Sequence, residues 1–163
     1  MAFKNILVAT DFSQESAAAL DAAIELGREP GATIQLLHVV DDPVTAAAWS
    51  EAYAFDVTEL SEQLLAQAER RLTSIQAAHT GIALSTRAVV GHPARTILEM
   101  AAAEHADLIV VGSHGHHAIT RLLLGSVADR VVRQAPCAVL IVKAVPVPAE
   151  STPTREAKTP IPA

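Results

Sequence analysis

Short apolar runs alternate with amphipathic stretches along most of the chain. Runs rich in Val, Ile and Leu predict strands over residues 6–10, 33–40, 82–90, 108–111 and 138–142. Between them, apolar residues recur at helical spacing and predict helices that begin near residues 13, 60, 93 and 126. Strands that alternate with helices favour an α/β fold with a parallel sheet and right-handed crossovers.

Three positions mark expected helix starts. Ser13 is a candidate N-cap with Glu15 in the first turn behind it, and Pro93 suits the first position of a helix. Ser126 is a second candidate N-cap, and Asp129 three residues later completes a pattern close to a capping box. The helices are therefore expected to begin directly after the loops that follow the strands.

A glycine loop follows the run at 108–111. Gly112 and Gly115 enclose Ser113 and His114, and nine residues later the chain reads Gly125-Ser126. Glycines allow positive φ and exposed amides, which together form anion-binding nests. A helix that starts just behind them favours phosphate. Each glycine alone is more often ordinary turn chemistry, but the joint spacing favours an anion-binding loop.

The general rule for parallel α/β sheets predicts where this loop lies. Ligands bind at the carboxyl ends of the strands, at the point where the strand order reverses. With the order 3-2-1-4-5, that point falls between the first and fourth strands. Asp11 then lies opposite Gly112.

Several segments together resemble the ATP-binding branch of the universal stress protein family. The resemblance spans roughly Phe3 to Lys143, and Ala9 departs from it because many relatives carry Pro there. It implies a Rossmann-like, adenine nucleotide alpha hydrolase-like α/β fold: a five-stranded parallel sheet in the order 3-2-1-4-5 with helices on both faces. The matching segments are residues 6–13, 36–40, 112–115, 125–127 and 135–142.

The resemblance also implies a ligand and its site. The ligand would be ATP, or AMP or ADP, with Mg²⁺ or Mn²⁺ held through the phosphates, and no residue is assigned as catalytic or as a metal ligand. Adenine and ribose would be surrounded by Thr10, Asp11 and Val39. Ribose and phosphates would be held mainly through backbone amides, by Gly112, His114, Gly115, Gly125, Ser126 and Val127.

Each of these residues also has an ordinary structural interpretation. Asp11 after a strand is often a turn former, and Val39 belongs to the core unless a ligand is present. His114, His116 and His117 are too closely spaced to aim two imidazoles at one ion, so solvated loop histidines are the favoured interpretation.

Composition and charge narrow the choice of compartment and partner. The chain has 163 residues, 50% of them hydrophobic and only 3% aromatic, and its formal net charge is −6. The acidic balance argues against a nucleic-acid or anionic-membrane surface, and no apolar run reaches the roughly 18 residues of a membrane span. With a single cysteine, Cys137, and no signal-like segment, a cytoplasmic location is expected.

Two regions differ from the rest of the chain. Residues 44–56 show mixed patterning and predict a loop or short helix over the sheet edge, and residues 144–163 are rich in Pro and polar residues. The expected organisation is one universal stress protein domain over 1–143 followed by a flexible tail over 144–163.

Three functions remain open at this point. The first is a stress-response sensor or regulator whose conformation, or unknown protein partner, depends on bound ATP. The second is a slow ATPase or a nucleotidyl or phosphoryl transferase, although the chain has no Walker motif and no Gly-x-Gly-x-x-Gly after the first strand. The third is a protein-interaction module without nucleotide. The family resemblance implies a homodimer through the last strand, Ala138 to Val142.

Overall fold

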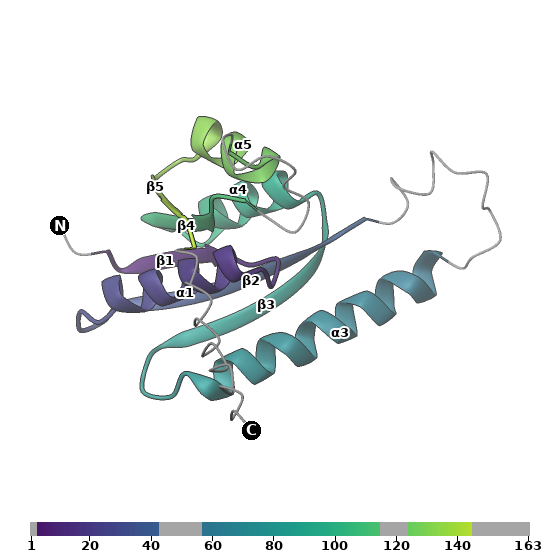
Figure 1. Ribbon diagram of the computed structural model, residues 1–163, viewed down its shortest axis with the longest axis horizontal. Coiled ribbons are helices and arrows are strands. Elements are labelled where there is room, and N and C mark those ends of the chain that lie inside the picture. Colours follow the sequence, from purple (N-terminus) through teal and green to yellow (C-terminus); the bar gives the residue numbers. More distant parts are fainter. Residues whose placement is uncertain (1–2, 43–56, 115–123, 145–163) are drawn as a thin grey trace, which may run out of the picture.

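The computed structural model describes residues 3–42, 57–114 and 124–144 (Figure 1). The predicted segment 44–56, Gly115 to Leu123 and the tail beyond Ala144 lie outside these described residues. Along the chain the elements are β1 (Asn5–Ala9), α1 (Gln14–Leu26), β2 (Thr33–Asp41), α3 (Val57–Ala78), β3 (Leu84–Gly91), α4 (Pro93–Ala103), β4 (Leu108–Gly112), α5 (Ser126–Gln134) and β5 (Ala138–Val142).

The strands form one parallel sheet in the order β3-β2-β1-β4-β5, which confirms the predicted order. β1 lies at the centre, where Ile6 pairs with Ile34 of β2 on one side and with Leu108 of β4 on the other. Since β1 meets both its neighbours with the same polarity, the carboxyl ends of all three strands lie at one edge of the sheet.

Each face of the sheet is covered by helices and has its own core. Ile6 and Val8 of β1 point to the face where α1 and α3 pack, together with Leu20 and Leu72 of those helices. Leu7, between them, points to the opposite face, where it packs with Ile97 of α4 and Val131 of α5. This alternation is the period-two pattern of a strand buried on both sides.

The predicted helix starts are partly confirmed. Ser13 caps α1, because its side chain accepts a hydrogen bond from the Ser16 amide, and Pro93 opens α4. The predicted cap at Ser126 is wrong: Gly125 is the N-cap residue, which has no side chain to cap the helix, and Ser126 is the first residue of α5. Gly125 already has the extended backbone, with φ −60° and ψ 152°, that a cap position requires.

The apolar stripe predicted for α3 is buried only in its second half. Ala68 and Leu72 lie in the core, whereas Leu60 and Leu64 are 43% and 36% exposed. α3 packs mainly on β3 and β2, and its first turns extend past the carboxyl ends of these strands (Figure 1). The exposed leucines are therefore available to line a cavity at that edge.

Gly112 is required by a close approach of α1 and not by backbone conformation. Gly112 does not use the positive φ that glycine allows, since the described glycines with positive φ are Gly31 and Gly81. A Cβ on Gly112 would lie 2.9 Å from the Glu15 Cβ and 3.1 Å from the Ser16 nitrogen. The absence of a side chain thus lets the first turn of α1 lie directly against the end of β4.

The described helices include none that combines the length and the hydropathy needed to cross a membrane.

Candidate functional site

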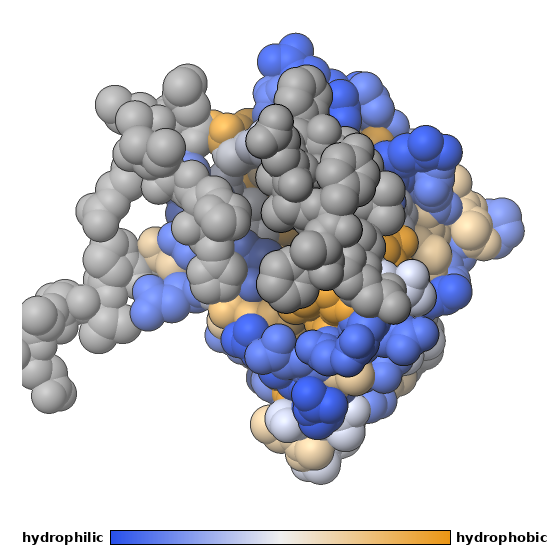
Figure 2. Space-filling model, turned by 90° about the vertical axis from the view of Figure 1, so that its right-hand side faces the viewer, coloured by the Kyte–Doolittle hydropathy of each residue, from blue (hydrophilic) through white to orange (hydrophobic). Residues whose placement is uncertain are grey.

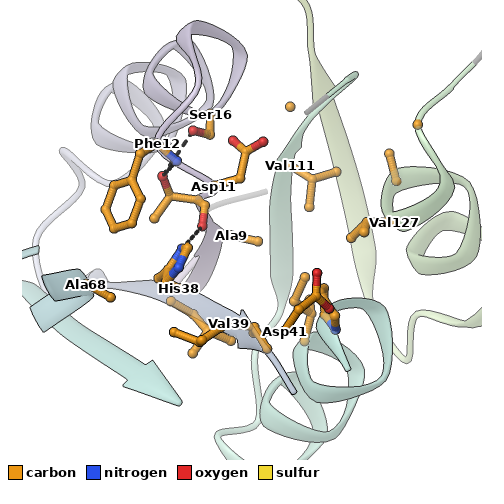
Figure 3. A pocket seen from close by; sticks show the side chains of 18 of the residues that line it. Ala9, Asp11, Phe12, Ser16, His38, Val39, Asp41, Ala68, Val111 and Val127 are labelled. Atoms are coloured by element: carbon orange, nitrogen blue, oxygen red, sulfur yellow. Dashed lines mark hydrogen bonds between the residues drawn. The ribbon is translucent and has the colours of Figure 1, made fainter. Parts of the chain in front are cut away.

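A crevice of about 580 Å³ opens at the carboxyl ends of β1, β2 and β4. Its walls come from these strand ends, the first turn of α1, the middle of α3 and the amino-terminal ends of α4 and α5. In Figure 2, hydrophobic residues on one face of the molecule lie among hydrophilic ones, and Figure 3 shows the lining side chains from close by. The crevice lies at the predicted position, where the strand order reverses.

The structure brings the predicted site residues together in this crevice. Gly115 alone lies outside the described residues, and the other residues all contribute to the lining: Thr10, Asp11, Val39, Gly112, His114, Gly125, Ser126 and Val127. They come from segments more than a hundred positions apart in the sequence. That they bind a nucleotide stays a prediction.

A network of side-chain hydrogen bonds ties the turn after β1 to the start of α1. The Ser13 amide donates to Asp11 Oδ1 at 3.0 Å, and the Ser13 hydroxyl donates to the same oxygen. The Phe12 amide donates to Thr10 Oγ1 at 3.0 Å, and this hydroxyl also pairs with Ser16 Oγ. The Asp11 carboxylate is thus held at the crevice by its own turn, which agrees with its structural interpretation as a turn former.

The other wall carries the uncapped start of α5. The Gly125 amide donates to the Ser113 carbonyl at 2.9 Å, and the Ser113 amide donates to the Val142 carbonyl at 2.7 Å. Ser113, which is 1% exposed, therefore anchors the loop to the end of β5. Ser126 and Val127 follow as the first helical residues, where amides have no partner within the helix and the helix dipole is positive.

His114 presents a buried nitrogen on the same side. Its Nδ1 lies 3.0 Å from the Ser113 hydroxyl, and its Nε2 is buried with no hydrogen-bond partner among the described residues. An unpartnered buried polar atom is costly in a folded protein. A ligand group in the crevice would remove that cost.

Sequence reasoning missed three lining residues that contact one another: Phe12, His38 and Arg71. The Phe12 and His38 ring centroids are 4.4 Å apart, and the Arg71 guanidinium carbon lies 4.0 Å from the Phe12 centroid. Nothing in the spacing of residues 12, 38 and 71 links them. The signal that was present is the polar His38 inside the otherwise apolar run at 36–40.

The hydrogen bond of His38 fixes its tautomer. Its Nδ1 lies 2.8 Å from the Thr10 carbonyl oxygen, which can only accept, so Nδ1 carries the proton. Burial lowers the pKa of His38 below its ordinary value, and the charge of Arg71 acts in the same direction. The Thr10 carbonyl, Asp11 and Asp41 oppose this shift without reversing it. His38 therefore favours the neutral form.

Among the described residues, the aspartate, glutamate, lysine and arginine side chains that line the crevice are Asp11, Asp41 and Arg71. Across residues 3–42, 57–114 and 124–144, no three His, Cys, Asp or Glu side chains gather closely enough to hold a metal ion. What the described lining offers an anion is one guanidinium and the backbone amides of a helix start.

Comparisons with known proteins agree with this geometry. The family model described as the universal stress protein family matches residues 2–143. A universal stress protein of Methanocaldococcus jannaschii is 35% identical over 141 residues, which cover 86% of this chain and 82% of that protein.

Two solved structures extend the comparison. The hypothetical protein MJ0577 is 30% identical with a TM-score of 0.76, over 88% of this chain and 97% of its own. A universal stress protein in complex with cAMP is 27% identical with a TM-score of 0.60, over 89% of this chain and all of that chain.

The lowered pKa of His38 predicts a pH dependence of stability. Below about pH 6.5, the ordinary pKa, the unfolded chain takes up a proton that the folded protein resists. The free energy of unfolding is therefore retained above pH 6.5 and falls as the pH drops toward the lowered pKa. Urea unfolding of wild type and His38→Gln between pH 5.0 and 7.5 measures this, and the variant is expected to lose less stability in acid.

His79→Gln is the matched control, because His79 also bonds a backbone carbonyl, that of Ile75, through Nδ1. Equal acid sensitivity of wild type and His38→Gln would contradict the assignment.

Proposed function

Since the chain belongs to the universal stress protein family, we propose that its crevice binds an adenine nucleotide, with ATP as the preferred form. The observation that carries the proposal is the pairing of two walls at the switch point. Asp11 lies on one wall and the uncapped start of α5 lies on the other. The structure of a relative in complex with cAMP supports an adenine nucleotide as the ligand class.

The first wall suits the nucleoside. Asp11 presents a carboxylate, which accepts hydrogen bonds from ribose hydroxyls or from the adenine amino group. Its Oδ1 is held by Ser13, so the carboxylate is oriented before ligand arrives. Val39 and Ala9 supply an apolar surface for the base in the same crevice, from the sheet face that α4 and α5 cover. Thr10 supports this wall through its bonds to Phe12 and Ser16.

The second wall suits the phosphates. The amides of Ser126 and Val127 open α5 without a side-chain cap, so an anion would complete the helix end. His114 Nε2 would gain the partner it lacks among the described residues. Gly112, Gly115 and Gly125 complete the loop, in the spacing that the sequence contains. The volume of about 580 Å³ is in the range typical of small-molecule sites.

A divalent cation, Mg²⁺ or Mn²⁺, would accompany ATP through its phosphate oxygens. The described crevice offers it at most Asp11 and Asp41 and no clustered ligand set, which fits a cation carried by the nucleotide. When bound, the cation would neutralise phosphate charge next to these carboxylates.

We favour a regulator over an enzyme. The described lining contains Arg71 and no lysine, so the lysine that bridges β- and γ-phosphates in Walker-type enzymes has no counterpart there. Slow ATP hydrolysis is the second candidate, with Asp11 as the carboxylate nearest the switch point. A cytoplasmic regulator that passes its nucleotide state to a protein partner is the proposed role.

A homodimer through β5 is part of the proposal. β5 is an edge of the described sheet, and its Val139 to Val142 are apolar and only half-buried. An apolar edge strand with open backbone groups favours pairing with a second copy.

Nucleotide binding is tested by identifying what the purified protein releases on denaturation, and by titrating ATP and adenosine calorimetrically. Both ligands are expected to bind, and Asp11→Ala is expected to weaken each by about tenfold, the value of a charge-assisted hydrogen bond. Asp21→Ala, on the exposed side of α1, is the control. No released nucleotide and no heat at several temperatures would favour the interaction module. Phosphate release that disappears in Asp11→Ala with binding retained would favour the enzyme.

Ser126→Pro tests the helix amides directly. Proline is well tolerated at the first position of a helix, and the extended Gly125 before it is compatible, so the fold is expected to persist. Loss of the N–H is expected to lower the affinity for ATP about tenfold and to leave the affinity for adenosine unchanged. Ser126→Ala removes only the hydroxyl and serves as the control. An unchanged ATP affinity in Ser126→Pro would place the phosphates elsewhere.

The dimer is tested by sedimentation of Leu140→Lys and wild type, with circular dichroism to check folding. A lysine in the middle of the edge strand is expected to give folded monomers, because it would bury charge between the two sheets. An unchanged mass in a folded variant would remove β5 from the interface.

A further inference from the structure

Three side chains from separate segments form a layered contact on the α1 and α3 side of the crevice. Arg71 of α3 lies over one ring, that of Phe12 in the turn after β1, and Phe12 in turn packs on His38 of β2. The two contacts are 4.0 Å and 4.4 Å, and the Phe12 and His38 rings are tilted by 33°. We call these three residues the Arg71–Phe12–His38 stack.

Phe12 has a backbone conformation that is unfavourable for a residue other than glycine. Its φ is +65°, in the left-handed region, and His105 is the other described non-glycine residue with positive φ. The left-handed region is unfavourable for a residue with a Cβ, and such a conformation persists only where its surroundings hold it. The surroundings of Phe12 include the hydrophobic core beneath α1 and α3, the cation and the imidazole of the stack, and the bond from its own amide to Thr10 Oγ1.

His38 also binds the backbone of the turn that carries Asp11. His38 Nδ1 donates to the Thr10 carbonyl at 2.8 Å, so His38 contacts both the residue before Asp11 and the residue after it. Asp11 is the residue between these two fixed points. Its carboxylate direction therefore depends on groups that lie outside its own turn.

We propose that Arg71, Phe12 and His38 are positioning residues for Asp11 and set the affinity of the crevice for the nucleoside part of its ligand. The proposal rests on the proposed nucleotide function and adds residues that have not been assigned to it. Arg71 acts through Phe12 and does not contact the phosphates.

The placement of the stack separates it from the phosphate wall. In Figure 3, Phe12, His38 and Ala68 lie on one side of Asp11, and Val127 at the start of α5 lies on the other. Ala68 precedes Arg71 by about one helical turn on α3, and both line the crevice. A cation on that side stabilises the turn that carries Asp11, at a distance from the α5 amides.

The decisive variants are Arg71→Ala and Arg70→Ala, adjacent positions on α3 that lose the same side chain. Both side chains are exposed, but Arg71 lines the crevice and Arg70 lies outside the lining. Adenosine and ATP are titrated against both. Arg71→Ala is expected to lower the affinities for adenosine and ATP by the same factor, about two- to fivefold. This factor corresponds to the loss of an exposed cation–π contact. Arg70→Ala is expected to leave both affinities unchanged, and Arg71→Lys is expected to restore part of the loss.

A second readout needs no nucleotide. Amide hydrogen exchange of Phe12 and Ser13 reports the two bonds inside the turn, to Thr10 Oγ1 and Asp11 Oδ1. Both amides are expected to exchange severalfold faster in Arg71→Ala than in Arg70→Ala, because the left-handed turn opens more often.

The outcomes separate this inference from the function on which it rests. A loss confined to ATP would make Arg71 a direct phosphate ligand and overturn the positioning role. Unchanged affinities in a wild type that binds both ligands would overturn it as well. If wild type binds neither ligand, the proposed function fails, and the exchange rates alone decide: faster exchange in Arg71→Ala supports the stack, and equal rates overturn it.

Discussion

The site exists because the chain crosses over opposite faces of the sheet on the two sides of β1. The crossovers from β1 to β3 run over one face of the sheet through α1 and α3, and those from β3 to β5 run over the other through α4 and α5. The loops that leave β1 and β4 therefore separate, although the strands are hydrogen-bonded neighbours. The crevice is open without any rearrangement of side chains, because the separation of the two loops already creates it.

The two walls differ in how far the protein satisfies its own polar groups. On the Asp11 wall, Ser13 and Ser16 hold the turn with side-chain hydrogen bonds, and Ser13 caps α1. On the α5 wall the N-cap residue is Gly125, which has no side chain to cap the helix, and His114 Nε2 lacks a partner among the described residues. Within the described residues, the Asp11 wall therefore satisfies its own polar groups more fully than the α5 wall, where an anion would bind.

The sequence predicted the sheet well because strands and helices have strong periodic signals. The bounds of β5, the cap at Ser13 and the strand order, which came from the family resemblance, agree with the structure. The predicted cap at Ser126 was wrong because both serine and glycine are common N-cap residues, so the Gly125-Ser126 pair allows the helix to begin at either of two neighbouring positions. The strand over 82–90 begins later, at Leu84, and Leu60 and Leu64 are exposed where α3 extends past the sheet.

Contacts between distant segments could not be predicted. The meeting of Phe12, His38 and Arg71 depends on the rotation of α3 over β2, which periodicity does not specify. The close approach behind Gly112 depends likewise on where α1 lies, which the presence of a glycine in the sequence does not specify.

The crevice walls come from residues near 10, 40, 70, 112 and 126, so no fragment of the chain can form them. Any molecule that fills the crevice would bind the native state alone, and mass action would then raise the global stability by RT ln(1 + [L]/Kd). The survival of the chain against proteolysis would rise and fall with the free concentration of that molecule. The cellular amount of such a protein would then depend on the concentration of its ligand, with no conformational change required.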